Sequence, residues 1–473
     1  MSTYARARLL VSLACVLAGA CRSDSPAARL AGELTGAYPE RATPTGAVRE
    51  FEIVAAEDEL PLVEGGALKV WAYNHRVPGP ELRVRLGDTV RVRFTNQLPQ
   101  PTTIHWHGVR VPNAMDGVPH VTQPPVEPGG SFVYEFTPKD AGTFWFHPHV
   151  RSSEQVERGL YGVLIVEDVA PPPYARDVVW VLDDWLLDER RQIFDRFNTP
   201  HDLAHDGRWG NFVTVNGRTD TRLDGHGGER IRLRLVNVSN ARSYAPDFSD
   251  LAPEIIAVDG LYLARPLPLG RFELAPGNRL DLDITLPPGR QSRSLPVIDR
   301  FYAERPNHLA DIVVDGTSLE PTRPFPSPAR AQVPSWSAGL ALPVTKEFRL
   351  DARRGGNLGI EWTINGEAFA GHEHAHAHGQ PMLTLERGGW VRLRFVNVSF
   401  RLHPIHLHGM FFRLLARNGT AVDEPFFRDT VLMHAQETID IGLVPLDAGK
   451  WMMHCHILEH AEAGMMTLFE VRG

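Results

Sequence analysis

Three segments of the chain share one pattern of apolar and charged positions. They lie at 90–94, 231–235 and 391–395, and each alternates apolar residues with arginines before an asparagine two residues later. A period of two is typical of a β-strand with one buried face, and we expect the arginines to point outward. The interval between copies is the size of a domain, which favours repeated domains over a solenoid.

Pro-rich stretches separate these three units. Residues 171–173 are three consecutive prolines, and 320–344 is rich in Pro, Ser and Ala. The chain has 41 Gly and 38 Pro among 473 residues, which favours turn-rich β structure with little helix. We therefore predict an all-β fold of three β-sandwich domains in tandem, at 48–170, 174–320 and 345–473.

The N-terminus has the character of an export signal over residues 1–20. Two arginines precede an apolar stretch that is too short to span a bilayer as a helix, and small residues lead up to Cys21. Plain cleavage and lipidation of Cys21 are both open. We expect an exported protein, periplasmic or extracellular, in which residues 21–47 form a flexible tether.

Composition and charge narrow the function classes. The chain is 43% hydrophobic and 22% charged, which is typical of a globular protein rather than a disordered one. A net charge of −8 argues against a nucleic-acid partner. The three cysteines cannot form a disulfide framework, because signal cleavage removes Cys15 and the folded body then contains only Cys455.

Histidines of the first and third units fall at matched positions. His105-Trp106-His107 stands nine residues after Asn96, and His406-Leu407-His408 stands nine residues after Asn397. The matching place in the second unit holds Pro246. The second unit therefore has no such pair.

A second His-x-His pair occurs in each outer unit. His147-Pro148-His149 and His454-Cys455-His456 both begin five residues after the glycine of an Asp-Ala-Gly sequence. Residues i and i+2 of a strand point to one face, so each of the four pairs directs two imidazoles the same way. If the outer units face each other, eight imidazoles converge on one metal cluster, for which Cu, Zn, Fe and Ni are all suitable.

Cys455 narrows the choice of metal. It lies between His454 and His456, so its side chain points to the opposite face, where it can meet His403 and His460. Two His and one Cys with a weak axial Met, here Met465, describe a blue-copper electron-transfer site. An electron at this site can pass through the Cys455 backbone into either flanking histidine.

Together these motifs resemble those of the multicopper oxidases, specifically the three-domain laccase-like branch. The likeness extends from about residue 50 to 473 and includes 115–119 and 159–162. It implies three cupredoxin-like Greek-key domains and four coppers per chain. It also implies that a substrate gives up four single electrons at a type 1 copper while a trinuclear cluster reduces O2 to two waters.

The resemblance assigns every ligand position of the family pattern to a residue of this chain. The type 1 copper would be held by His403, Cys455, His460 and Met465, the type 2 copper by His105 and His406, and the type 3 pair by His107, His147, His149, His408, His454 and His456.

Oxygen reduction also needs protons, and the resemblance places Asp116 near the type 2 copper as their relay. Many bacterial members have a Glu directly after the second type 1 histidine, where this chain has Ala461. Either Glu459 or Glu462 substitutes for it, or the second relay is missing.

For the electron donor we expect phenols or aromatic amines at an exposed edge of His460. Oxidation of Cu(I) is the alternative, since related copper-detoxifying enzymes add a Met-rich substrate site. The chain has only 9 Met and carries Arg401 close to His403, which disfavours a cation there. The His-rich stretch 372–378 is the main evidence for the alternative.

Three other classes remain less favoured: a carrier with one blue copper, a copper nitrite reductase and a copper-free scaffold. The four complete His-x-His pairs and the intact ligand set speak against them. A monomer is the default, because one chain supplies all eight cluster histidines.

Overall fold

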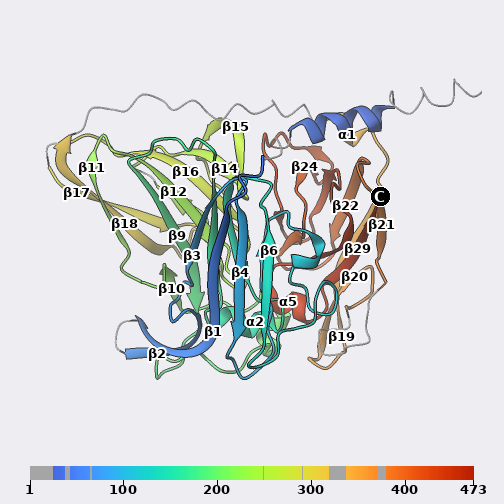
Figure 1. Cartoon of the computed structure of the whole chain (residues 1–473), viewed down its shortest axis with the longest axis horizontal. Coiled ribbons are helices and arrows are strands. Elements are labelled where there is room, and N and C mark those ends of the chain that lie inside the picture. Colours follow the sequence, from blue (N-terminus) through green and yellow to red (C-terminus); the bar gives the residue numbers. More distant parts are fainter. Residues whose placement is uncertain are drawn as a thin grey trace, which may run out of the picture.

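The computed structural model describes residues 25–37, 43–63, 66–248, 250–289, 291–318, 337–369 and 380–473. Within these residues six sheets form three β-sandwiches, which confirms the predicted fold class. In Figure 1 the first sandwich (blue to cyan) lies between the second (green to yellow) and the third (orange to red). The predicted export signal and Cys21 lie outside the described residues.

The first sandwich packs the sheet β2-β1-β4-β6 on the sheet β3-β8-β7-β5. Its strands are β1 (Val48–Val63), β2 (Gly66–Tyr73), β3 (Glu81–Arg85), β4 (Thr89–Asn96), β5 (His105–His107), β6 (Ser131–Phe136), β7 (Gly142–His147) and β8 (Gly162–Glu167).

The second sandwich packs the sheet β10-β9-β12-β16-β14-β15 on the sheet β11-β18-β17-β13. Its strands are β9 (Arg176–Trp185), β10 (Phe212–Val215), β11 (Arg222–Gly227), β12 (Arg230–Asn237), β13 (Pro246–Asp247), β14 (Glu254–Val258), β15 (Leu261–Pro268), β16 (Arg279–Thr285), β17 (Arg293–Asp299) and β18 (Asn307–Ser318).

The third sandwich packs the sheet β20-β19-β22-β27-β24-β25 on the sheet β21-β29-β28-β23-β26. Its strands are β19 (Lys346–Arg354), β20 (Ile360–Ile364), β21 (Leu383–Glu386), β22 (Val391–Asn397), β23 (His403–Leu407), β24 (Phe412–Arg417), β25 (Thr420–Ala421), β26 (Thr430–Met433), β27 (Thr438–Leu443), β28 (Gly449–Cys455) and β29 (Met466–Arg472).

Helices are short, and all of them except α1, which precedes the first strand, lie between strands. They are α1 (Pro26–Ala37), α2 (Ser152–Glu157), α3 (Pro200–Ala204), α4 (Ser337–Leu340) and α5 (Leu458–Glu462), with one 3-10 turn, η1 (Asn113–Met115). No helix among the described residues is long and apolar enough to cross a membrane.

The three repeat strands have the same place in each sandwich. β4, β12 and β22 each run parallel to the first strand of their own domain, which is β1, β9 or β19. The asparagine at the end of each strand then repeats one set of hydrogen bonds. Its side-chain oxygen accepts from the N–H two residues later, and its Nδ2 donates to two backbone carbonyls. This asparagine fixes the start of the loop that leads to each outer His-x-His pair.

The prediction that the repeat arginines point outward is wrong for Arg232, Arg234 and Arg392, which are all buried. The face of β12 that carries the first two is covered by the first sandwich, where the Arg234 guanidinium donates to Thr143 Oγ1 at 2.7 Å. Arg392 is covered by the turn after α4 and donates to the carbonyl of Leu342 at 2.7 Å. Pattern within one strand cannot predict these contacts, because they come from other domains and linkers.

The prediction of a flexible tether is wrong for Pro26–Ala37, which forms α1. Its apolar residues recur on one side of the helix, and Leu30, Ala31, Leu34 and Ala37 are buried. In Figure 1, α1 lies along the top of the third sandwich near β24. One hydrophobic core cluster contains Leu34 of α1, Val92 of the first sandwich and Phe411 of the third. Helix α1 therefore packs where the two outer domains meet.

The docking of α1 predicts a stability effect. We call the interface between the first and third domains the seam. Leu34 is fully buried, so Leu34→Ala is expected to remove about 2–5 kcal/mol of favourable burial and to lower the midpoint of thermal unfolding at the seam. Calorimetry of the full chain would measure it, with the exposed neighbour Glu33→Ala as the matched control. An unchanged midpoint for Leu34→Ala would mean that the segment is a tether after all.

Candidate metal centre

The four His-x-His pairs meet between the first and third sandwiches. Within each sandwich the two pairs begin on adjacent strands, where His105 is opposite His147 and His406 is opposite His454. His149, His408 and His456 stand just after the ends of β7, β23 and β28. All eight imidazoles are buried. The predicted convergence is therefore present in the structure.

The imidazole nitrogens fall into groups that mix the two outer domains. Within each group the ligand atoms lie within 4.8 Å of one another. The groups are His107, His147 and His456; His149, His408 and His454; and His105, His107 and His406. The first two together contain the six residues predicted for the type 3 pair, and the third contains both residues predicted for the type 2 copper.

The donor atoms fit a metal better than they fit the protein alone. Nε2 of His105, His147 and His406 is buried without a hydrogen-bond partner among the described residues. Burial, together with the neighbouring imidazoles, holds the pKa of His107 and His408 well below the usual range. Neutral imidazoles with unused nitrogens are what a copper or zinc site requires.

Hydrogen bonds at Nδ1 orient the rings. The Nδ1–H of His105 donates to the carbonyl of Asp116 at 2.8 Å, and that of His408 donates to Asp116 Oδ2 at 2.9 Å. On the other side, His406 Nδ1 donates to the carbonyl of Asp429 at 3.0 Å. These contacts fix the tautomer and leave Nε2 for the metal.

Asp116, the predicted proton relay, thus contacts the cluster directly, at the end of the 3-10 turn η1. A second carboxylate, Asp429, was not predicted from the sequence. Its Oδ1 lies 3.3 Å from His107 Nε2, and it follows Arg428 in a stretch without any spacing signal. The direct approach of this residue to the cluster depends on how two domains dock.

The second predicted site is formed by His403, Cys455 and His460, all fully buried. The Cys455 Sγ lies 3.6 Å from His403 Nδ1 and 3.9 Å from His460 Nδ1. Burial raises the pKa of the Cys455 thiol well above its usual range, so a metal is needed to hold it as a thiolate. Met465 is buried in the same core cluster, and its carbonyl accepts the Cys455 N–H at 3.0 Å.

The prediction of an exposed His460 edge is wrong, because the second domain covers it. His460 is 0% exposed, and its Nε2–H donates to the carbonyl of His205 at 2.7 Å. Trp362 packs on the ring at 4.2 Å and donates its Nε1–H to the carbonyl of Leu203 at 2.8 Å. We refer to residues 199–209, which include α3, as the cover segment. The histidine and its cover are far apart in sequence, so no local pattern reveals them.

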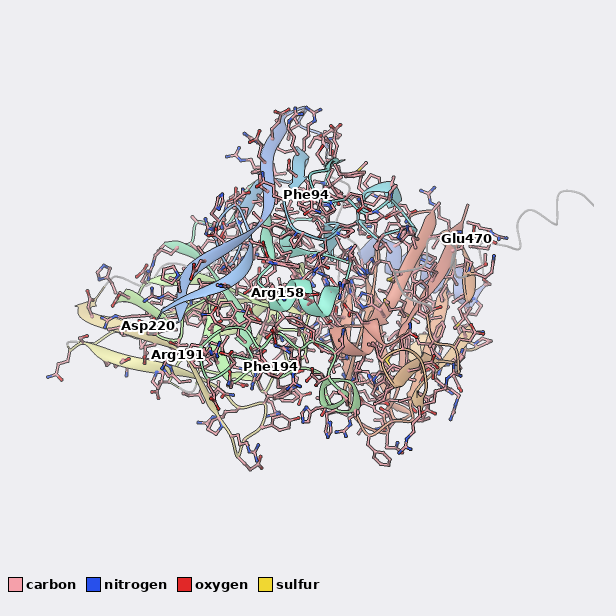
Figure 2. The ribbon with its side chains drawn as sticks, turned by 90° about the horizontal axis from the view of Figure 1, so that it is seen from below. Phe94, Arg158, Arg191, Phe194, Asp220 and Glu470 are labelled. Carbon is pink, nitrogen blue, oxygen red and sulfur yellow. The ribbon has the colours of Figure 1, made fainter. Side chains whose placement is uncertain are left out.

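The two alternative relay residues lie on α5 beside His460. Glu459 is buried, which raises its pKa to about 7, and it accepts from Asn240 Nδ2 at 2.9 Å. Glu462 accepts from the Ser153 N–H at 2.9 Å and borders a cleft of about 780 Å³ between α2 and residues 194–200. Figure 2 shows this face, with Arg158 and Phe194 labelled. Among the described contacts neither carboxylate reaches a cluster histidine, whereas Asp116 and Asp429 both do.

The His-rich stretch 372–378, the main evidence in the sequence for Cu(I) as the electron donor, lies outside the described residues.

Three family models describe successive parts of the chain, each as multicopper oxidase. They match residues 56–171, 176–292 and 342–473. Each matched segment falls within or along one sandwich, and the second match ends before β17 and β18.

Individual relatives extend over nearly the whole chain. The multicopper oxidase MmcO of Mycobacterium tuberculosis is 27% identical over 85% of this chain and 83% of its own. Laccase-1 of Cryptococcus neoformans is 25% identical over 86% of this chain and 78% of its own. The crystal structure of a multi-copper oxidase from Pseudomonas thermotolerans is 35% identical, with a TM-score of 0.79, and covers 90% of this chain and 100% of its own.

The close packing behind the cluster predicts the effect of one added methyl group. Gly277 has φ +89°, and a Cβ there would lie 2.9 Å from His107 Cε1 and 3.0 Å from His456 Cδ2. Gly277→Ala is therefore expected to displace both rings and to weaken metal binding about 10-fold or more. Titration of the metal-free protein would measure it, with Gly270→Ala as control, since that Cβ meets nothing within 4 Å. Equal affinities for the two variants would contradict the role of this packing.

Proposed function

Because the chain belongs to the multicopper oxidase family, we propose that it couples four one-electron oxidations of a reducing substrate to the four-electron reduction of O2 to water. The observation that carries the proposal is the position of Cys455. Its side chain belongs to the group with His403 and His460. The residues on either side of it, His454 and His456, each belong to one of the two groups that contain only predicted type 3 ligands. One peptide segment thus joins the two sites.

The residues present fit four coppers per chain. Copper, when bound, supplies the one-electron couples that the reaction needs. His403, Cys455 and His460, with Met465, would hold the type 1 ion, His105 and His406 the type 2 ion, and the two mixed groups the type 3 pair. Separation of the sites keeps the reducing substrate away from the enclosed place where oxygen is reduced.

The protein itself supplies orientation and protons at the seam. Asp116 Oδ2 holds His408, while Asp116 Oδ1 lies 3.3 Å from His105 Nδ1 and accepts no hydrogen bond among the described residues. A carboxylate beside the cluster with one oxygen outside any hydrogen bond can carry a proton to reduced oxygen. We assign the proton relay at the cluster to Asp116. For the second relay we propose Glu462 of α5, because it borders the cleft.

The surface around the cover segment favours aromatic donors. Among the described residues the exposed large aromatic side chains are Tyr302 and Phe400, and both lie beside the cover. Tyr302 packs on Trp209 at 5.3 Å, and Leu402, close to Phe400, donates its N–H to Asp206 at 2.8 Å. Phenols or aromatic amines can stack here, and the Cryptococcus relative carries the name laccase.

A second candidate donor, Cu(I), is favoured by one observation. His201 and His205 of the cover segment are exposed and stack at 4.3 Å, and the carbonyl of His205 is the one that caps His460. Imidazole is a good copper ligand. Only His205 would separate an ion held there from His460 of the proposed type 1 site.

Export is also part of the proposal. The apolar N-terminal stretch before Cys21 fits an exported oxidase, either cleaved plainly or lipidated at Cys21. Mass spectrometry of the mature chain tests cleavage and lipidation together.

Copper content and oxygen uptake test the main proposal. The purified chain should contain four coppers and consume O2 with a reducing donor. Asp116→Asn should keep all four, because the amide oxygen still accepts from His408, but should reoxidise ~10²-fold more slowly after reduction. Stopped-flow mixing of the reduced protein with O2 measures this step. One copper per chain would defeat the oxidase proposal, and normal reoxidation of Asp116→Asn would defeat the relay.

Paired variants separate the two donors. Phe400→Ala and Tyr302→Ala should raise the KM for a methoxyphenol several-fold and leave Cu(I) oxidation unchanged, because they remove only stacking surface. His201→Ala should do the reverse if Cu(I) is the donor. Steady-state O2 uptake with each donor gives both values, with the exposed Val169→Ala as control. A loss of Cu(I) oxidation alone, on a wild type that prefers Cu(I), would replace the laccase-like assignment.

A further inference from the structure

The second domain has no copper ligand in the proposed scheme, yet it reaches the cluster. Arg279, at the start of β16, and Asp259, just before β15, are both fully buried. They lie beside Asp429, the carboxylate that the sequence did not predict. The question is what the second domain does at a site to which it gives no ligand.

Every donor of the Arg279 guanidinium has an acceptor. Its Nε donates to the carbonyl of Thr143 on β7 at 3.1 Å, and its two amino groups donate to the carbonyls of Gly277 and Asp259, both at 2.8 Å. The same amino groups form a fork on Asp429, at 3.0 Å to Oδ1 and 2.6 Å to Oδ2. Five N–H groups thus meet five acceptors, and one side chain joins all three domains.

Asp429, which the Arg279 fork holds, in turn contacts two histidines of the cluster. Its Oδ1 contacts His107 of the first domain at 3.3 Å, and its carbonyl accepts from His406 of the third at 3.0 Å. The Arg279 fork places a positive charge directly on this buried carboxylate. The fork therefore fixes the direction in which Asp429 faces the two rings.

Asp259 secures the backbone on which Asp429 stands. Its Oδ2 accepts from the N–H of Asp429 at 3.1 Å, and its Oδ1 accepts from the N–H of Arg279 at 3.1 Å. Asn278 adds a bond from its Nδ2 to the carbonyl of Thr430 at 2.9 Å. The side chain and the main chain of Asp429 are thus both held by the second domain.

We propose that Arg279 is a positioning residue for the trinuclear centre, which sets His107 and His406 through Asp429. The proposal rests on the copper assignment of the proposed function. Removal of the guanidinium would leave Asp429 buried without its counter-charge and without the two hydrogen bonds that aim it, so the side chain would turn toward other donors. This movement withdraws the acceptor that holds the two rings.

Arg279→Gln and Arg279→Lys test the role through copper itself. Arg279→Gln should keep the blue type 1 absorption and lose copper from the cluster, with affinity about 10–100-fold lower, as for other residues that orient metal ligands. Lysine keeps the charge but not the fork, so Arg279→Lys should retain more copper with an altered type 2 signal. Copper analysis, electron paramagnetic resonance and Cu(I) titration of the metal-free protein provide the readouts.

Arg232→Gln is the matched control. Arg232 is also a buried arginine of the second domain that pairs with an aspartate, Asp281, at 3.1 Å, but it contacts no cluster histidine among the described residues. It should lower stability and leave copper content and the type 2 signal unchanged. Equal copper loss in both variants would reduce the role of Arg279 to general stability.

The remaining outcomes are also decisive. If Arg279→Gln does not fold, the type 2 signal of Arg279→Lys decides: a changed signal supports the proposal and an unchanged one overturns it. Four coppers and an unaltered signal in Arg279→Gln overturn it as well. Fewer than four coppers in the wild-type protein would instead contradict the proposed function.

Discussion

The structure depends on one constraint: imidazoles from two domains are buried together with nitrogens that the protein does not satisfy. Each buried polar atom without a partner costs about 1–3 kcal/mol, so the seam is unfavourable until a metal takes up these nitrogens. Other contacts must therefore hold the outer domains together around it. The shared core cluster at α1 and the Arg279 fork are two such contacts, and neither supplies a histidine of the cluster.

The two carboxylates at the seam show how evenly the outer domains contribute. Asp116 comes from the first domain and contacts one histidine of each outer domain, and Asp429 comes from the third and does the same. They differ in support, because Asp116 ends a 3-10 turn of its own domain whereas Asp429 is held by the second. The second domain, which supplies no ligand, thus provides for Asp429 the support that Asp116 receives from its own domain.

The sequence predicted what is local and repeated, and it missed what arises between domains. Alternation in one strand, together with the His-x-His spacing, is enough to predict a sandwich and a shared imidazole face, because strand geometry fixes both. Asp429, the buried Arg234, the docked α1 and the cover over His460 depend on surfaces that are far apart in the chain. Leu30, Ala31, Leu34 and Ala37 did carry a helical period in the predicted tether, so α1 alone was within reach of sequence reasoning.

The cover segment changes how the choice of donor should be understood. His460 contacts no solvent, so in the proposed scheme a donor outside couples to it through the His205 carbonyl, which accepts a single hydrogen bond of 2.7 Å from His460 Nε2. The outer face of that carbonyl is built by the second domain and by the loop at 400–402, not by the copper ligands. Because the cover segment contains none of the proposed type 1 ligands, the proposed donor preference can change while those ligands stay the same. In the proposed scheme the ligand motifs therefore set the chemistry, and the residues around the cover segment select the electron donor.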